Sequence, residues 1–283
     1  MSEVDFQKMR VAFQGEPGAF SEAAAVQLLG EGISTVPRAT FDATFRAIIE
    51  GRADALLVPV ENTLAGSVVR VYDLLLKSPL EICGETILPI EHHLMGHPGA
   101  KFQEIRVVAS HPMALAQCEG FFEANPQVKR VPAEDTAGSV REMMERGDKT
   151  CAAIAGRRAA GQYGAAILRQ GIQDDAENFT RFVLLLPPEQ AQRYRAKDAK
   201  KMSLAMRLAH RPGALLASLE PFSKHGANLL KIESRPIHGR PFEYQFYVDV
   251  EADRREQLEK ALKEVRGATS DLRVLGLYEA AQR

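Results

Sequence analysis

The sequence contains few cysteines and no long apolar run. Its three cysteines, Cys83, Cys118 and Cys151, are widely spaced and none belongs to a CxxC pair, so neither a zinc site nor a disulfide framework is indicated. Each has apolar neighbours, which favours small buried side chains. The first residues lack the apolar core of a signal peptide, and no later run approaches the length of a membrane span. These absences predict a cytoplasmic protein.

The sequence also lacks an excess of either charge. It has 36 Lys and Arg residues against 37 Asp and Glu residues, a net charge of −1. Proteins that bind nucleic acid need a concentrated positive surface, so this balance argues against that class, although a local basic pocket for an acidic small molecule remains compatible with it. The 283 residues, 45% hydrophobic and 26% charged, predict a globular protein of two domains or three lobes.

Two patterns of secondary structure follow one another along the chain. Up to residue 187, short apolar runs such as ALLVPVEN alternate with amphipathic stretches such as FSEAAAVQLLG, which predicts βα units around largely parallel sheets. Residues 188–201 are charged and nearly free of large apolar side chains, which predicts a linker. From residue 202 the strand–helix–strand–strand–helix–strand order predicts a ferredoxin-like α+β domain.

Several predicted strands of the first part end in polar turns that open helices. These turns are Gln14-Gly15, Glu61-Asn62, Ser110-His111 and Asp135-Thr136. Ligands of parallel α/β sheets lie beyond the carboxyl ends of the strands, and helix N-termini attract anions. The turns therefore indicate either a site for a small carboxylate or ordinary helix caps. The loop Gly15–Gly18 matches neither GK[ST] nor GxGxxG, so nucleotide binding is not expected.

The stretch NFTRFVLLL places an arginine at the start of an apolar run. Strand alternation puts Thr180 and Arg181 on opposite faces, so both reach one site only if the strand begins at or after Thr180. An arginine in an apolar row needs a carboxylate, supplied either by a ligand or by Asp174, Asp175 or Glu177 nearby.

A metal site is not predicted. The histidines His92, His93 and His97, with Glu91 beside them and His111 further on, fit no standard zinc spacing.

Six stretches, in order over nearly the whole chain, resemble the prephenate dehydratases of the kind without a fused mutase domain. VAFQGEPGAFSEAAA, PVENTLAGSV, SHPMALAQC and NFTRF resemble the catalytic part. HRPGALL and IESRP resemble the two signatures of the phenylalanine-responsive ACT domain. Met113 stands where glutamine is common in that family, and Thr63 stands where serine is more frequent.

The resemblance implies a catalytic domain over residues 1–187 and an ACT regulatory domain over residues 202–283. The catalytic domain is expected to be α/β with two lobes, as in type 2 periplasmic binding proteins. Lobe 1 is expected to span about 1–85 and 172–187, and lobe 2 about 86–171. Such an enzyme is a carbon–oxygen lyase that removes water and CO₂ from prephenate to give phenylpyruvate in L-phenylalanine biosynthesis, without metal or organic cofactor. The resemblance further implies allosteric inhibition by L-phenylalanine and a homodimer or homotetramer. Two alternatives stay open, namely an arogenate dehydratase and a non-catalytic two-lobed protein that binds amino acids or organic anions.

The resemblance also implies the site residues. Thr180 is expected to donate a hydrogen bond to the leaving hydroxyl, and Arg181 to hold a carboxylate. The other catalytic candidates are Glu61, Asn62, Thr63, Ser110 and His111, and the substrate-binding candidates are Gln14, Gly18, Ser21, Thr136 and Phe179. The effector-binding candidates are His210, Gly213, Ala214, Leu215, Asn228, Leu229, Glu233, Ser234, Arg235 and Pro236. Plain packing is the alternative for this last set, with Arg235 paired only to Glu233.

Overall fold

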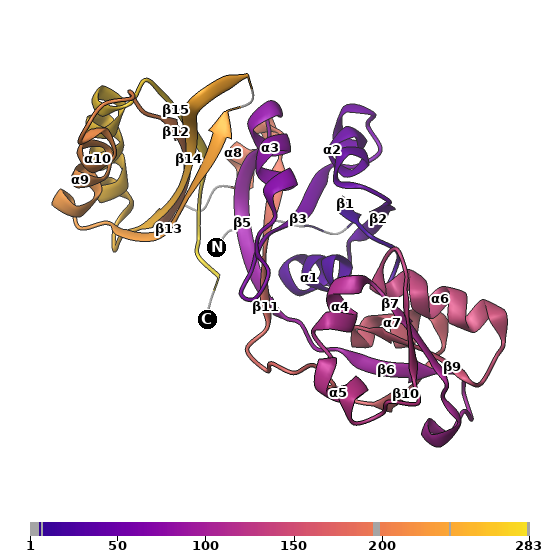
Figure 1. Ribbon diagram of the computed structural model, residues 1–283. Helices are drawn as coiled ribbons and strands as arrows, with labels where there is room; N and C mark the ends of the chain where they lie inside the picture. Colours follow the sequence, from indigo (N-terminus) through magenta and orange to yellow (C-terminus); the bar gives the residue numbers. More distant parts are fainter. Residues whose placement is uncertain (1–5, 7, 195–198, 238, 282–283) are drawn as a thin grey trace. The chain divides into compact units, whose positions relative to one another are not determined.

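The computed structural model describes residues 6, 8–194, 199–237 and 239–281 (Figure 1). They form two compact units. The first unit contains Phe6–Val71 and Thr86–Phe182, and the second contains Tyr72–Glu85 and the chain from Val183 onward.

One half of the first unit, here called lobe 1, is a sheet with parallel central strands. Strand β1 (Arg10–Gln14) pairs in parallel with β2 (Ser34–Arg38) and with β3 (Ala55–Asn62), and β4 (Gly66–Ser67) pairs antiparallel with the end of β3. The first residues of β11 (Phe179–Leu186) follow β3 in the sheet order. Helices α1 (Phe20–Leu29) and α2 (Phe41–Ile49) pack on these strands. The interiors of β1 and β3 are apolar and buried, as expected of central parallel strands.

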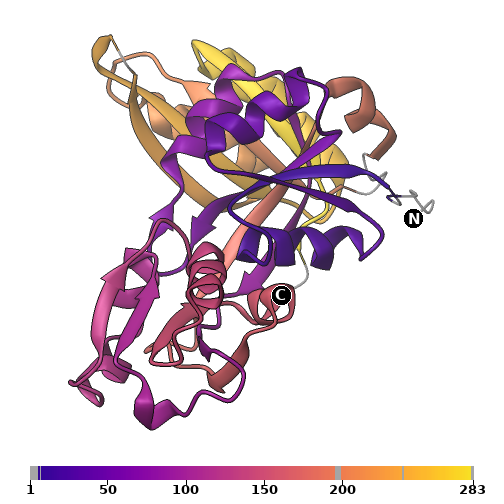
Figure 2. The same ribbon diagram turned by 90° about the vertical axis from the view of Figure 1, so that its right-hand side faces the viewer.

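The other half of the first unit, lobe 2, has a sheet of its own (Figure 2). Its five strands follow the order β10-β6-β9-β7-β8. Its strands are β6 (His93–Gly96), β7 (Val107–Ser110), β8 (Lys129–Pro132), β9 (Cys151–Ala155) and β10 (Ala166–Arg169). Strand β7 is parallel to β8 and β9, whereas β6 is antiparallel to β9 and β10. The helical segments are η1 (Phe102–Glu104), α4 (Pro112–Ala116), α5 (Glu119–Glu123), α6 (Thr136–Arg146) and α7 (Arg157–Tyr163).

Two chain segments cross between the lobes. One follows β5 (Glu81–Pro89) into β6, and the other follows β10 into β11. They are hydrogen-bonded to each other, because Ile90 N donates to Asn178 O at 2.7 Å and Ile172 N donates to His92 O at 2.8 Å. Backbone pairing therefore fixes the place where the lobes meet.

The second unit contains the predicted ferredoxin-like order. It runs through β12 (Lys201–Arg207), α9 (Ala214–Lys224), β13 (Asn228–Ile237), β14 (Arg240–Glu251), α10 (Arg255–Ala268) and β15 (Asp271–Tyr278). The strand order β13-β14-β12-β15 is antiparallel, and α9 and α10 cover one face. Alternate strand residues such as Met202, Leu204 and Val248 are buried in a core with Leu258 of α10.

Residues Tyr72–Glu85, assigned from the sequence to lobe 1, belong to this second unit. Strand β5 pairs in parallel with β15 at Ile82 and Gly276. The Arg273 guanidinium donates to the carbonyl oxygens of Leu76 (2.7 Å) and Ser78 (2.6 Å) after helix α3 (Val69–Lys77). These oxygens have no partner within the helix, so a cation from β15 holds the helix end.

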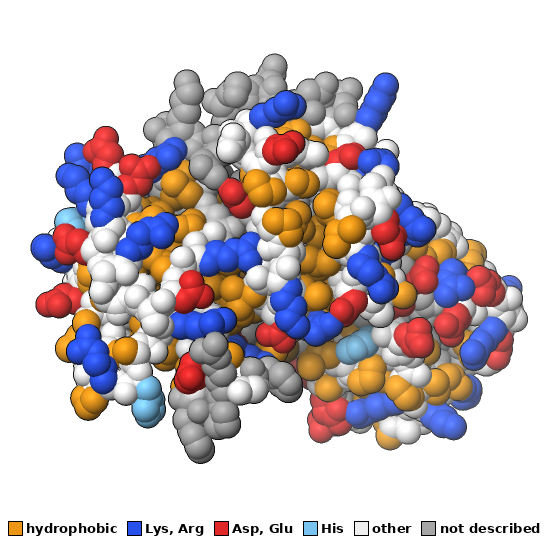
Figure 3. Space-filling model, turned by 90° about the horizontal axis from the view of Figure 1, so that it is seen from above, with side chains coloured by type: hydrophobic (Ala, Val, Ile, Leu, Met, Phe, Trp, Pro, Cys, Tyr) orange, Lys and Arg blue, Asp and Glu red, His pale blue; other side chains and the backbone are white. Residues whose placement is uncertain are grey.

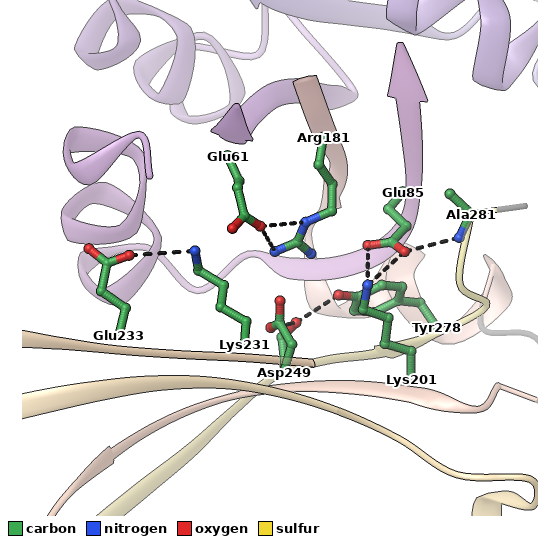
Figure 4. Close-up of polar contacts among 10 residues, drawn as sticks. Glu61, Glu85, Arg181, Lys201, Lys231, Glu233, Asp249, Tyr278 and Ala281 are labelled. Carbon is green, nitrogen blue, oxygen red and sulfur yellow. Dashed lines mark hydrogen bonds and ion pairs between the residues drawn. The ribbon is translucent and has the colours of Figure 1, made fainter. Parts of the chain in front are cut away.

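The other face of the second sheet carries buried polar side chains (Figure 4). Lys201 Nζ lies 2.8 and 2.9 Å from the two carboxylate oxygens of Glu85, and both side chains are almost completely buried. Ser203 Oγ lies 2.6 Å from Asp249 Oδ1 and 2.7 Å from the Tyr278 hydroxyl. Each of these polar groups therefore has a partner, as burial requires.

The segment predicted as a linker contains helix α8 (Pro188–Tyr194), in which Ala191 is buried. Residues 195–198, also predicted as linker, lie outside the described residues, as does His238 between β13 and β14. On the face shown in Figure 3, basic and acidic side chains are interspersed, in keeping with the near-zero net charge.

Candidate functional site

The ends of β3 and the start of β11 lie side by side where the lobes meet. The Asn62 amide nitrogen Nδ2 faces three acceptors: Asn178 Oδ1 at 2.8 Å, Thr180 Oγ1 at 2.9 Å and Phe179 O at 3.1 Å. Its oxygen Oδ1 accepts from Leu64 N and Ala65 N at 3.0 and 2.8 Å. These backbone donors fix the direction of the amide, so Asn62 donates toward β11.

Thr180 is buried and receives a hydrogen bond from Asn62 on its hydroxyl oxygen. A threonine hydroxyl can accept two hydrogen bonds and donate one. Within the described residues no protein acceptor takes the Thr180 hydroxyl hydrogen. The Thr180 hydroxyl can therefore still donate its hydrogen to a ligand, as the predicted role requires.

Thr63, the neighbour of Asn62, uses its hydroxyl differently. Thr63 Oγ1 donates to Glu177 O and accepts from Phe179 N, both at 2.9 Å. The backbone nitrogen of Thr63 also donates to Phe179 O at 2.9 Å. The hydroxyl hydrogen of Thr63 therefore holds the start of β11, and the predicted role of Thr63 in the site stays a prediction.

Thr180 and Arg181 lie on opposite faces of β11, which begins at Phe179 and not at or after Thr180. Arg181 Nε and Nη2 lie 3.3 and 3.2 Å from Glu61 Oε2 (Figure 4). The side chains are 12% and 38% exposed, so the arginine is the more buried partner. The side chains of consecutive strand residues point to opposite faces of a sheet. Glu61 therefore pairs with Arg181 on one face, and Asn62 pairs with Thr180 on the other.

The acidic residue shown paired with Arg181 is Glu61, which is 120 residues away in the sequence. Asp174 instead accepts from Glu119 N (2.7 Å) and Gly120 N (2.9 Å) at the start of α5. Asp175 Oδ1 accepts from Glu177 N at 2.8 Å. The two aspartates shape the crossing segment, and Glu61 balances the arginine.

Lobe 2 contributes the end of β7 and the short helix α4. Ser110 is fully buried and donates from Oγ to Ile154 O at 2.6 Å, so its hydroxyl hydrogen is committed to the sheet. His111 is exposed, and its Nδ1 accepts from Met113 N at 3.2 Å, which leaves Nε2 to carry the proton of the neutral ring. Met113 is 48% exposed. At the start of α6, Asp135 Oδ1 caps Gly138 N at 2.7 Å, next to Thr136.

Gly18 of lobe 1, which was predicted to bind substrate, lies at a contact between the two lobes. The Gly18 N–H donates to Glu22 Oε2 at 2.7 Å. A Cβ on Gly18 would lie 2.8 Å from Ala159 Cα, and its φ of +87° also favours glycine. The buried Glu22 carboxylate accepts from Arg158 Nε of lobe 2 at 3.1 Å as well. The Gly18 N–H thus has a protein acceptor and the residue packs tightly on lobe 2, while its assignment to substrate binding stays a prediction.

The other two lobe 1 candidates have ordinary surroundings. Ser21 is 8% exposed on α1, and Gln14 Nε2 donates to Ala39 O at a long 3.4 Å. Neither observation bears on substrate binding, and both assignments stay predictions.

Sequence reasoning missed three polar residues that join the lobes. Asn178 Nδ2 donates to Gln117 Oε1 at 3.1 Å, and the same oxygen lies 2.9 Å from His92 Nε2. Gln117 and Asn178 lie inside the quoted motifs SHPMALAQC and NFTRF, and that placement was the available signal. Burial lowers the pKa of His92 more than the Gln117 hydrogen bond raises it, so the ring is neutral near pH 7.

The effector candidates lie on the second unit. Gly213 has a φ of +78° before α9, and a Cβ there would meet nothing within 4 Å. Strand β13 is at the end of the sheet order and exposes Leu229 and Ile232 to 40% and 41%. Glu233 pairs with Lys231 Nζ at 3.5 Å (Figure 4), not with Arg235 as the packing alternative assumed. Arg235 Nε is buried without a hydrogen-bond partner among the described residues.

The remaining effector candidates differ in exposure. Ala214 is buried, whereas His210, Leu215, Asn228, Ser234 and Pro236 are exposed.

In the described part of the chain, no group of three or more His, Cys, Asp or Glu side chains is placed to hold a metal ion. Among the described helices, none has the length and apolar character that a membrane span requires.

The chain is similar to one protein family over most of its length. Residues 11–190 match the prephenate dehydratase family, and residues 202–267 match the ACT domain. The Arabidopsis thaliana protein named arogenate dehydratase/prephenate dehydratase 1, chloroplastic, is 38% identical over 292 residues, which cover 98% of this chain and 74% of that protein.

Two solved structures are similar over nearly the whole chain. Prephenate dehydratase from Arthrobacter aurescens in complex with L-Phe is 30% identical with a TM-score of 0.84, over 95% of this chain and 89% of that one. GqqA, a quorum quenching acylase of a novel type, is 33% identical with a TM-score of 0.85, over 96% and 98%. These likenesses confirm the predicted two-lobed, periplasmic-binding-protein-like α/β fold followed by an ACT domain.

Proposed function

The chain belongs to the prephenate dehydratase family of carbon–oxygen lyases and carries an ACT domain, and from this we propose that it converts prephenate to phenylpyruvate, water and CO₂ in L-phenylalanine biosynthesis. The observation that carries the proposal is the Asn62–Thr180 hydrogen bond between β3 and β11, which directs a buried hydroxyl at the junction of the lobes. Family membership in a lyase family also disfavours the non-catalytic alternative.

The reaction asks for modest chemical assistance and good positioning. Loss of CO₂ pushes electrons into the ring, and hydroxide leaves from the opposite carbon. That departure is helped by a hydrogen bond or a proton. The hydroxyl of Thr180 is a poor acid, so we assign it the hydrogen bond to the leaving group. Aromatisation supplies driving force, and a fixed donor in a buried site needs no reorganisation as the reaction proceeds.

We propose distinct roles for the other site residues. Asn62 aims the Thr180 hydroxyl, and His111, which is exposed at the end of β7, is the titratable candidate that faces solvent. The Glu61–Arg181 pair supports β3 and β11 from their other face, since strand alternation separates it from Thr180. Thr63 and Ser110 secure backbone through their hydroxyls.

The substrate assignment is between prephenate and arogenate, its aminated counterpart. The Arabidopsis relative is named for both activities. We propose prephenate, because the A. aurescens neighbour, which is similar over 95% of this chain, is named a prephenate dehydratase.

We further propose that L-phenylalanine inhibits the enzyme by binding to the ACT domain of a homodimer or homotetramer. The A. aurescens neighbour was solved in complex with L-Phe. In this chain, Gly213 opens helix α9 with space beside its Cα, and free N–H groups of a helix N-terminus suit an amino-acid carboxylate. The exposed edge strand β13, which carries Leu229 and Ile232, suits pairing with a second copy.

Product formation from prephenate and from arogenate tests the function directly, with and without L-phenylalanine and with a blank that contains no enzyme. Wild type is expected to form phenylpyruvate from prephenate, and Thr180→Ala to lower kcat at least about hundredfold with little change in KM. Thr180→Ser, which keeps the hydroxyl, is the matched control and is expected to retain most activity. A folded Thr180→Ala variant with near-normal kcat would remove Thr180 from the mechanism. Product from arogenate alone would reassign the substrate.

The similarity to GqqA supports a second candidate function, an acylase activity in the same fold. An assay for release of the acyl group from an N-acylated amine checks it with the same protein samples. Acyl release by wild type without any product from prephenate or arogenate would favour the acylase.

A further inference from the structure

Asn178 is a nearly fully buried asparagine between the two lobes, with 1% of its surface exposed. Its Oδ1 accepts from Asn62 Nδ2 of lobe 1 at 2.8 Å, and its Nδ2 donates to Gln117 Oε1 of lobe 2 at 3.1 Å. One side chain thus links the residue that aims Thr180 to the segment that follows helix α4.

The directions of these hydrogen bonds determine one another. The oxygen of Asn62 is taken by the N–H groups of Leu64 and Ala65, so Asn62 presents its NH₂ to Asn178. The oxygen of Asn178 must then face Asn62, and its NH₂ faces Gln117. Gln117 Oε1 meets two donors, Asn178 Nδ2 and the protonated Nε2 of His92. None of the three side-chain amides, of Asn62, Asn178 and Gln117, can turn over without placing donor against donor or acceptor against acceptor.

A purely structural role would use different partners. Asn125 in lobe 2 is an example, because its Nδ2 donates to the backbone carbonyl of Phe121 at 2.8 Å. The amide of Asn178 instead contacts only side chains, and those side chains end at Thr180 in one direction and at His92 in the other. Its backbone carbonyl separately accepts from Ile90 N. The side chain is therefore not needed to satisfy the backbone of the crossing segment.

We propose that Asn178 is a positioning residue, which couples the placement of lobe 2 to the orientation of the Thr180 hydroxyl through Asn62. This inference rests on the proposed function, in which Thr180 assists the leaving hydroxyl. Loss of the bridge leaves Asn62 with two acceptors for its two hydrogens, so the Asn62–Thr180 bond survives. What is lost is the fixed position of that bond relative to lobe 2.

Two variants test the proposal in the full chain, with prephenate or whichever substrate wild type converts. Asn178→Ala removes both bonds and is expected to lower kcat about ten- to hundredfold with KM within about threefold, because small misplacements of reacting groups have effects of that size. Asn178→Asp keeps the shape and the acceptor for Asn62 but turns an oxygen toward Gln117 Oε1. Asn125→Asp is the matched control, and its kcat is expected to equal that of wild type.

The pH dependence of kcat in Asn178→Asp distinguishes a positioning role from a purely structural one. When its carboxyl is protonated it can donate to Gln117 again, and burial raises the pKa of such a carboxyl toward the working range. The ratio of its kcat to that of wild type, measured at each pH between about 5.5 and 8, is therefore expected to rise as the pH falls. Division by the wild-type value removes the titration of groups common to both proteins, including the buried His92 and His93.

The outcomes separate this proposal from the proposed function. If Thr180→Ala abolishes activity but Asn178→Ala leaves kcat unchanged, the positioning role is overturned and the function stands. A ratio for Asn178→Asp that does not change with pH also overturns the positioning role. If Thr180→Ala is fully active, the proposed function fails first. A lowered kcat in Asn178→Ala together with recovery of Asn178→Asp at low pH supports the bridge, and this second variant keeps the test decisive if Asn178→Ala does not fold.

Discussion

Replacement of Lys201 by methionine is expected to destabilise the second unit by about 3–5 kcal/mol. Lys201 Nζ contacts both oxygens of Glu85 at 2.8 and 2.9 Å, and the side chains are only 8% and 2% exposed. The variant removes the ammonium group from the buried Glu85 carboxylate, which also accepts from the backbone N–H of Ala281 at 3.0 Å. A buried charge without its counter-ion accounts for most of the loss.

The double variant Lys201→Met/Glu85→Met separates charge from packing. An apolar pair of similar volume is often as stable as a buried ion pair, so the double variant is expected to recover part of the loss. About 1–3 kcal/mol should remain missing, because the Ala281 N–H loses its acceptor. Lys224→Met is the control, since the Lys224–Glu264 pair is 62% and 41% exposed and its loss is expected to leave the free energy of unfolding nearly unchanged.

Tyrosine fluorescence during urea unfolding suits this measurement. The sequence has no tryptophan and six tyrosines, of which Tyr72, Tyr194, Tyr244, Tyr247 and Tyr278 belong to the second unit and only Tyr163 to the first. The signal therefore reports mainly on the unit that contains the ion pair. A Lys201→Met protein within about 1 kcal/mol of wild type, or a double variant less stable than the single one, would refute the reasoning.

Three further predictions follow from the same contacts. Arg181→Lys is expected to lower stability and to leave KM within about twofold, because Arg181 pairs with Glu61 on the face opposite Thr180; a large rise in KM in steady-state assays would assign it a substrate carboxylate instead. Gly213→Val is expected to abolish inhibition by L-phenylalanine and spare kcat, because it narrows the open N-terminus of α9 at a φ of +78°; a full inhibition curve in this variant would contradict the site. His92 and His93 have pKa values lowered from 6.5 chiefly by burial, so the unfolded chain binds more protons below that pH. The stabilising contribution of the two neutral histidines is expected to be fully present above about pH 6.5. Below that pH, the free energy of unfolding is expected to fall by at most about 1.4 kcal/mol per pH unit for each histidine. Urea unfolding midpoints, followed by circular dichroism, that rise on acidification would contradict this prediction.

The sequence predicted those features of the fold that depend on local pattern. The run ALLVPVEN became β3 (Ala55–Asn62) because an unbroken apolar stretch suits a strand buried on both faces. The ferredoxin-like order of the second unit also followed from alternating strand and helix periods. Helix α8 was missed because PPEQAQRY was judged by its charge, although Ala191 gives it one buried contact.

Contacts between distant segments could not be predicted in the same way. Glu61 and Arg181 are 120 residues apart, and Gln117 and Asn178 are 61 apart. Their pairing depends on β3 and β11 being neighbours and on two crossings between the lobes, which no local pattern specifies. Asp174, Asp175 and Glu177 were considered beside a ligand as partners of Arg181 because they are close in sequence. In the structure Arg181 pairs with the distant Glu61, and Asp174 and Asp175 accept from backbone N–H groups.

The same limit explains why Thr180 emerges as the strongest of the predicted hydroxyl groups. Thr63, Ser110 and Thr180 each lie at an end of a strand, and their side chains are equivalent as donors in the sequence. In the described structure, Thr63 donates to Glu177 O and Ser110 to Ile154 O, so their hydrogens are committed to backbone. Thr180 instead accepts from Asn62 and keeps its hydrogen. A hydroxyl that is buried, held by an acceptor bond and still able to donate is the one that a departing hydroxide can use without breaking a bond already made.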